Sequence, residues 1–93
     1  MNITITGEVF EWRGPAPFYF VRVPQEECAL IKSIASQVTY GWGVVPTYAT
    51  IGETRWKTSL MPKDGQYLVP MKDAIRNTEG IEEGDTVEIE LEI

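Results

Sequence analysis

The chain has 93 residues, 43% of them hydrophobic, with a formal net charge of −6 and no histidine, and a chain of this size can bury one small core. The acidic balance disfavours nucleic acid as a partner, because that affinity is built from Lys and Arg that displace counterions, and the lack of histidine removes the commonest general base and metal ligand. We therefore expect one domain over residues 1–93 that is not an enzyme and needs no cofactor or metal.

The pattern of apolar residues predicts the first two strands at residues 2–12 and 18–23. One face of the first segment alternates along the chain through Ile3, Ile5, Gly7 and Val9. Phe10 and Trp12 fall on the other face, which indicates a bulge or a change of surroundings near the glycine. The second segment, FYFVRV, is almost wholly apolar, so we expect both of its faces to be covered. The Pro and Gly residues of 13–17 predict the turn between the two strands.

A helix is predicted at about residues 25–37. Pro24 suits the first position of a helix, and Glu26 and Glu27 fall in its first turn, where the positive end of the helix dipole favours acids. One apolar stripe recurs at helical spacing through Cys28, Ile31, Ile34, Ala35 and Val38. Cys28 is the only cysteine, so it forms no disulfide within the chain, and we expect a small buried hydrophobe.

Residues 40–46 predict a strand that continues through 47–52, and residues 55–70 predict a hairpin. In the hairpin's first strand, alternation places two sets on opposite faces: Trp56, Thr58 and Leu60 inward, and Arg55, Lys57 and Ser59 outward. The segment PKDG at 62–65 has the chemistry of a turn, so QYLVP at 66–70 is expected to fold back as the partner strand.

The rest of the chain predicts a short helix at about residues 71–78 and a final strand. Gly80 is well placed as the C-terminal cap of that helix, and EEGD at 82–85 predicts a turn. The last strand alternates between two sets, with Val87, Ile89, Leu91 and Ile93 toward the core and Glu88, Glu90 and Glu92 toward water. These elements indicate a mostly β fold, a barrel with minor helical content.

Nearly the whole chain resembles one known family. The residues that carry the resemblance are FVRVP before the helix, YGWGVVPTYATIGETRWKTSLMP, and GQYLVPMKDAIRNTEGIEEGDTVEIELEI. They are similar to the domain-of-unknown-function family numbered nineteen-zero-five. The resemblance implies a double-split β-barrel and no established activity. Relatives often carry a second domain similar to bacteriocin-protection proteins, and we expect this chain to carry the barrel alone.

Residues 67–93 also resemble a second group of proteins. The order of strand, short helix, GIEEGD and final strand is similar to the swapped-hairpin half-barrel of transition-state regulators and antitoxins that bind DNA. In those proteins two chains complete the barrel and present basic loops. Here one chain supplies enough strands, and the segment holds only Lys72 and Arg76 against eight acids. The resemblance of residues 67–93 therefore supports a shared architecture more strongly than it supports DNA binding.

Arg55, Lys57 and Ser59 are candidate ligand-binding residues because they share one strand face. They could grip an anion, and Lys57 with Ser59 is the composition of a Ser–Lys nucleophile pair, which requires a desolvated lysine. The alternative, which we favour, is that these cations pair across the sheet with the last strand's acids, Glu88, Glu90 and Glu92. Those acids stand about 6.6 Å apart along the strand, too far to wrap one metal ion, so we expect a solvated face.

Trp42 and Arg76 complete the candidate site. Trp42 has a glycine on each side and is a candidate to line the barrel mouth, where small ligands bind, whereas Trp56 is expected to fill the core. An enclosed pocket near Trp42, Arg55 and Lys57 would favour ligand binding, and a flat basic strip there would favour nucleic acid. Arg76 is expected to pair with an acid of the 79–85 segment.

The leading functional hypothesis is a non-catalytic binding or interaction module with an unknown partner. A DNA-binding or antitoxin-like regulator is the alternative, and a small hydrolase comes last because the chain has no histidine. With no charged-then-apolar leader and no long apolar run, we expect a cytoplasmic protein without a membrane partner. We expect a monomer, with a weak homodimer as the alternative.

Overall fold

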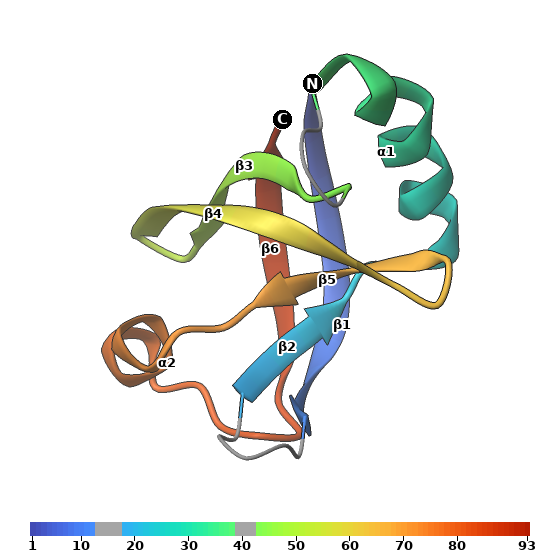
Figure 1. The fold of residues 1–93 in the computed structure, drawn as a ribbon. Coiled ribbons are helices and arrows are strands. Elements are labelled where there is room, and N and C mark those ends of the chain that lie inside the picture. Colours follow the sequence, from blue (N-terminus) through green and yellow to red (C-terminus); the bar gives the residue numbers. More distant parts are fainter. Residues whose placement is uncertain (13–17, 39–42) are drawn as a thin grey trace.

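The computed structural model describes residues 1–12, 18–38 and 43–93, with the side chains of 35–38 excepted. Within these described residues, six strands and two helices follow one another in the order β1 (Asn2–Trp12), β2 (Phe18–Arg22), α1 (Gln25–Val38), β3 (Val45–Ile51), β4 (Thr54–Lys63), β5 (Gln66–Pro70), α2 (Asp73–Glu79) and β6 (Thr86–Glu92). Figure 1 shows α1 and α2 on opposite sides of the strands. In the described part of the chain, neither helix is long and apolar enough to cross a bilayer.

The strands close into a barrel in the order β1-β2-β5-β4-β3-β6, and each neighbouring pair is antiparallel. Two long strands change partner part-way along. β1 pairs with β6 over 2–8 and with β2 over 9–12, and β4 pairs with β3 over 54–60 and with β5 over 61–63. One chain thus closes the barrel, and the predicted mostly β barrel with one longer and one short helix is confirmed.

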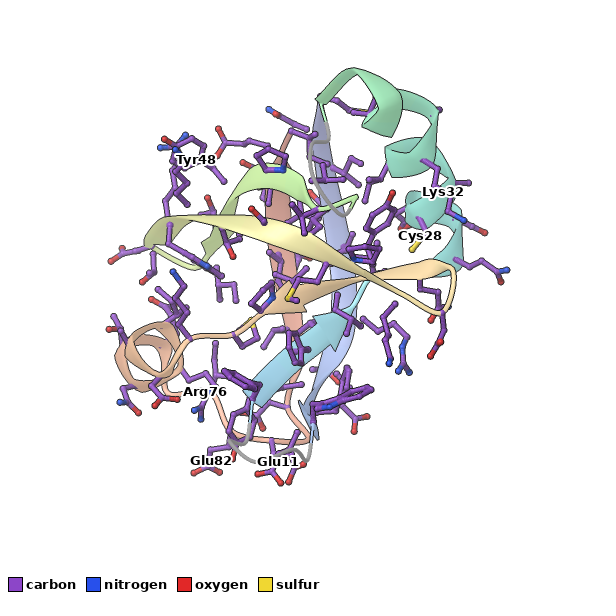
Figure 2. The ribbon with its side chains drawn as sticks, in the orientation of Figure 1. Glu11, Cys28, Lys32, Tyr48, Arg76 and Glu82 are labelled. Carbon is purple, nitrogen blue, oxygen red and sulfur yellow. The ribbon has the colours of Figure 1, made fainter. Side chains whose placement is uncertain are left out.

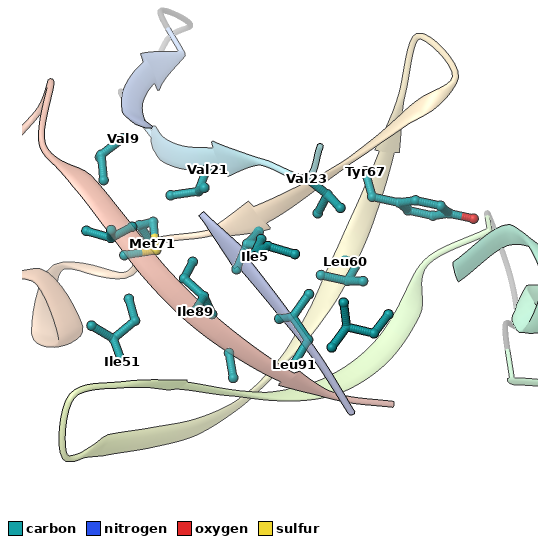
Figure 3. Close-up of a cluster of buried hydrophobic side chains, with 14 of the residues drawn as sticks. Ile5, Val9, Val21, Val23, Ile51, Leu60, Tyr67, Met71, Ile89 and Leu91 are labelled. Carbon is teal, nitrogen blue, oxygen red and sulfur yellow. The ribbon is translucent and has the colours of Figure 1, made fainter. Parts of the chain in front are cut away.

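The barrel interior is packed with the inward-facing side chains of the strands. Figure 3 shows this cluster, in which Ile5, Val9, Val21, Leu60, Ile89 and Leu91 are almost completely buried. The predicted alternation of β1 and β6 is confirmed in their burial patterns. Gly7 lies where β1 passes close to β2, since a Cβ there would stand 2.8 Å from Val21 Cγ1 and 3.1 Å from the Arg22 carbonyl oxygen. The sequence predicted a change of surroundings near Gly7. The structure shows it as this close approach to β2, next to the point where β1 exchanges β6 for β2 as its partner.

Helix α1 extends one residue beyond its predicted end, and it packs its apolar stripe on β3 and β5. Cys28 is only 3% exposed and its thiol donates to the Val23 carbonyl oxygen at 3.3 Å, and Ile31 is fully buried. The predicted Ala35 and Val38 contacts lie outside the described side chains. Cys28 is therefore a buried core thiol, as predicted.

Helix α2 begins at Asp73, two residues later than predicted. Met71 cannot be helical, because its backbone N–H donates to the Tyr19 carbonyl oxygen at 2.8 Å and its side chain is buried in the core. Lys72 is extended at the helix N-cap. Gly80 ends the helix in the left-handed conformation with φ of 65°, which confirms the predicted glycine cap.

The β4–β5 hairpin has a tighter turn than the predicted 62–65 segment. Its two turn residues are Asp64 and Gly65, with φ of 51° and 79°. Positive φ at both positions matches the right-handed twist of the strands and is the geometry that Asp-Gly favours. Pro62 and Lys63 consequently remain in β4, opposite Tyr67 and Gln66.

Candidate functional site

Arg55 lies on the outer face of β4 and is engaged by the sheet itself. Its guanidinium donates from Nε to Glu92 Oε2 at 3.0 Å and from Nη2 to Glu92 Oε1 at 3.2 Å. It also lies 3.9 Å from the centre of the Tyr48 ring. The bond with Glu92 raises the pKa of Arg55 and lowers that of Glu92. Arg55 thus makes the ion pair across the sheet that we favoured from the sequence.

Lys57 and Ser59 follow Arg55 on the same outer face. Lys57 is exposed and stands opposite Tyr48, and Ser59 is half-buried opposite Pro46. A serine nucleophile activated by lysine needs a desolvated amine, and the solvated Lys57 does not provide one. In the described part of the chain, this face presents a stacked ion pair and the exposed ammonium group of Lys57.

Arg76 lies on α2, near one end of the barrel with Glu11 and Glu82 (Figure 2). Its guanidinium carbon stands 3.8 Å from the centre of the Tyr19 ring, and its Nε donates to the Met71 carbonyl oxygen at 3.4 Å. Its acidic partner is Asp73, three residues earlier on the same helix. The prediction that Arg76 pairs with an acid of 79–85 is therefore wrong, because the helix already places a carboxylate within its reach.

Tyr19 connects this arginine to β1. The Tyr19 hydroxyl donates to Glu11 Oε2 at 3.0 Å. That hydrogen bond to a carboxylate stabilises the protonated phenol and raises the pKa of Tyr19. Glu11 in turn is held by its backbone N–H, which donates to Glu83 Oε2 at 3.2 Å. Arg76 and Tyr19 thus belong to a network that fixes α2 and the 82–85 turn against β1.

Trp42 lies outside the described residues, and so does its candidate position at the barrel mouth. Trp56 belongs to the core cluster and is 9% exposed. The neighbours Arg55 and Trp56 therefore point to opposite faces of β4, as strand alternation predicts.

An apolar groove lies on the outer side of the barrel wall, and none of the predicted site residues that the structure describes lines it. Its volume is about 220 Å³, and it is lined by Trp12, Phe18, Phe20, Met61, Pro62, Lys63 and Leu68. Three of these side chains are large, hydrophobic and exposed: Trp12 at 39%, Phe18 at 58% and Met61 at 44%. We call this feature the aromatic groove.

The strand registers explain why these residues meet outside the barrel. Val9 pairs with Val21 inside, so the next pair along, Phe10 with Phe20, faces outward, and so does Trp12 with Phe18. On the other side, Met61 pairs with Leu68. Phe20 and Leu68 are buried although neither belongs to the core cluster. The groove is therefore the surface of a second, smaller apolar cluster on the outside of the wall.

Two cations stand at the rim of the aromatic groove. The Lys63 ammonium lies 4.4 Å from the centre of the Trp12 ring, and the Arg22 guanidinium carbon lies 5.0 Å from the centre of the Phe10 ring. Arg22 and Lys63 make no ion pair with a carboxylate of the described residues. The rim is thus locally positive on a chain whose total charge is −6.

A protein-family model described as "Domain of unknown function (DUF1905)" matches residues 6–91. The chain belongs to this family. The resemblance drawn from the sequence motifs is thereby confirmed, and the closed barrel fits it. No curated protein matches the chain.

In this DUF1905 chain, the sequence contains a pattern that indicates the groove, although none of the predicted site residues in the described part of the chain belongs to it. Phe10 and Trp12 fall on the face of β1 opposite the core positions, and β2 is almost wholly apolar. Both patterns place large apolar side chains on the outer face of the barrel. Among the described residues, no group of three His, Cys, Asp or Glu side chains could hold a metal ion.

Proposed function

We propose that this DUF1905 domain is a non-catalytic binding module and that the aromatic groove is its site. The observation that carries the proposal is the gathering of exposed apolar side chains. Of the six large hydrophobic side chains exposed in the described part of the chain, three line this one groove. Concave apolar patches of this kind are typical of binding sites, whereas scattered exposed hydrophobics need no explanation.

The chemistry of the lining favours binding over bond making. The groove is walled by aromatic rings, a thioether, a proline and a leucine, and Lys63 is the one residue of this lining that carries a charge. General acid–base catalysis needs a titratable group beside the reacting atoms, commonly in a matched pair. An exposed lysine over an indole ring supplies attraction for an anion.

A neutral aromatic probe tests the proposal directly. In a titration of the ¹⁵N-labelled protein with indole, we expect saturable amide shifts at residues of the groove such as Trp12, Met61 and Leu68. The substitution Phe18→Ser removes an exposed wall, so it should weaken indole binding about ten-fold, which is the loss of one favourable apolar contact. Leu30→Ser is the matched control, because Leu30 is 50% exposed on α1 and lines no part of the groove.

Two results would contradict the proposal. One is a set of indole-induced shifts that is scattered over the surface or centred on Tyr48 and Arg55. The other is an equal loss of binding in Phe18→Ser and in the Leu30→Ser control. The native fold of each variant is checked by its amide spectrum without the probe, so a folding defect is not mistaken for a binding defect.

The proposal includes a monomeric module in the cytoplasm. Its support is that six strands of one chain close the barrel, so no second copy is needed to complete it. The lone Cys28 is a buried free thiol, which needs no oxidising compartment.

A further inference from the structure

A second hollow adjoins the aromatic groove. Its volume is about 290 Å³ and it is lined by Phe18, Tyr19, Phe20, Met71, Lys72 and Asp73. Phe18 and Phe20 line both hollows. The two spaces therefore flank one phenylalanine ridge on β2. Each is large enough for one bulky side chain, and a ligand that crosses the ridge can fill both.

The shape of the ridge favours inserted side chains over stacked bases. The Phe10 and Phe20 rings are tilted by 38° and the Phe18 and Phe20 rings by 45°. Single-stranded nucleic acid is usually held by aromatic faces on which successive bases stack, together with a positive track for the phosphates. The tilted Phe18 and Phe20 rings share one hollow with Met61 and Leu68 and the other with Met71, and such walled hollows suit aliphatic and aromatic side chains.

The charges differ between the two hollows. At the second hollow, Arg76 is paired with Asp73 and the Tyr19 hydroxyl is bonded to Glu11, and the lining itself holds one cation, Lys72, beside the acid Asp73. At the aromatic groove, Lys63 and Arg22 face no described carboxylate within ion-pair distance. An acidic group on a ligand is thus attracted more strongly to the aromatic groove end, where two cations stand without an ion-paired carboxylate among the described residues, than to the second hollow, where Lys72 lies beside Asp73.

From these features we propose that the occupant is an extended acidic segment of a partner protein, with two bulky apolar side chains. One apolar side chain fills the aromatic groove beside a carboxylate that meets Lys63 or Arg22, and the other fills the second hollow. The inference rests on the proposed function, which supplies the groove, and adds the class of partner. A second copy of this chain is disfavoured because one chain already closes the barrel and needs no partner strand.

Synthetic peptides test the partner class. The probe is a short labelled peptide with Leu and Trp two positions apart and Glu on the Leu side, compared with the same peptide carrying Lys in place of Glu. Fluorescence anisotropy should show the acidic peptide binding about ten-fold more tightly than the basic one. Lys63→Glu should weaken the acidic peptide about three- to ten-fold, the range for a reversed charge at an exposed rim. Added salt should weaken acidic-peptide binding and leave indole binding unchanged.

Lys57→Glu is the matched control, because Lys57 is an exposed strand lysine that lines neither hollow. The affinity of this variant for each peptide should stay within about two-fold of the parent protein's affinity. The acidic partner is overturned if the protein binds the two peptides with equal affinity, or if Lys57→Glu weakens acidic-peptide binding as much as Lys63→Glu does. In either case, indole binding at the groove would still support the proposed function. Tighter binding of oligodeoxythymidylate than of the acidic peptide, or dimerisation that blocks both hollows, overturns the acidic partner as well. Failure of both peptides and of indole overturns the proposed function too.

Discussion

Arg55 on β4 and Glu92 on β6 form a two-pronged ion pair over β3, the strand that separates them. Tyr48 of β3 stands directly opposite Glu92 in the register, and its ring lies under the guanidinium. The pair therefore connects three strands on the outside of the barrel. Both side chains keep contact with water, at 52% and 31% exposure, so salt screens the pair and its contribution to stability is small.

The first prediction concerns the pKa of Glu92, which the hydrogen bond from Arg55 lowers. A lowered folded-state pKa stabilises the fold above the pKa of the unfolded chain, and this contribution is lost as the pH falls through the folded-state pKa. Arg55→Met should return the Glu92 pKa toward its ordinary value, measured by an NMR titration of the side-chain carboxyl carbon. Lys57→Met, on the same strand face, should leave that pKa unchanged. An unchanged Glu92 pKa in Arg55→Met would contradict the ion pair.

The success of the sequence prediction at this strand has a simple cause. Strand alternation has a period of two and depends only on local backbone geometry, so it placed Arg55 outside and Trp56 inside without knowledge of the partners. The same local rule predicted the alternation of β6. The Asp-Gly turn and the Gly80 cap were predictable for the same reason, since both follow from the backbone conformations that these residues favour.

The start of α2 and the aromatic groove were not predicted, because both depend on contacts between residues that are far apart in the sequence. Met71 is extended because its N–H bonds to Tyr19, a residue of another strand, and no pattern within 71–78 reveals that bond. The aromatic groove needs Trp12, Phe18 and Met61 to meet from three strands. Their meeting depends on the register and on the order in which the barrel closes. The sequence indicated outward apolar residues but not where they converge.

The second prediction concerns Trp56, whose indole N–H is buried without a hydrogen-bond partner among the described residues. Trp56→Ala should lower the free energy of unfolding by about 3–5 kcal/mol through the lost apolar contacts and the cavity. Trp56→Phe keeps most of the ring and removes the unpaired donor, so it should cost less than about 1.5 kcal/mol. Urea denaturation measures both. A phenylalanine variant as unstable as the alanine variant would show that the indole N–H is paired.

The third prediction concerns the close approach of β1 and β2 at Gly7. Gly7→Ala should destabilise the protein by about 1–3 kcal/mol, because the new methyl group meets the Val21 side chain and the Arg22 carbonyl. Val21→Ala removes one of these two obstacles, so Gly7→Ala should cost less in that background than in the parent. Chemical denaturation of the four proteins in this double-mutant cycle measures the coupling. Additive effects would contradict the contact with Val21.

The fourth prediction separates the binding module from a DNA-binding regulator. Residues 67–93 contain two cations, Lys72 and Arg76, and Arg76 is already paired with Asp73 and stacked on Tyr19. A phosphate backbone would thus meet one available lysine among eight acids. We expect no binding to duplex DNA at physiological salt, and any binding at low salt should fall steeply as salt is raised, because it reports only counterion release.

Sedimentation and a labelled-duplex titration test this prediction together. Because one chain closes the barrel, the protein should sediment as a monomer at the concentrations used for the titration. Lys72→Glu should leave the sedimentation coefficient unchanged and weaken any residual binding at low salt, since Lys72 is the cation of residues 67–93 that makes no ion pair with a described carboxylate. Lys32→Glu on α1 serves as the charge-matched control. A tight dimer that holds a specific duplex site at physiological salt would instead establish the regulator, and the aromatic groove would then have to be explained as part of its dimer interface.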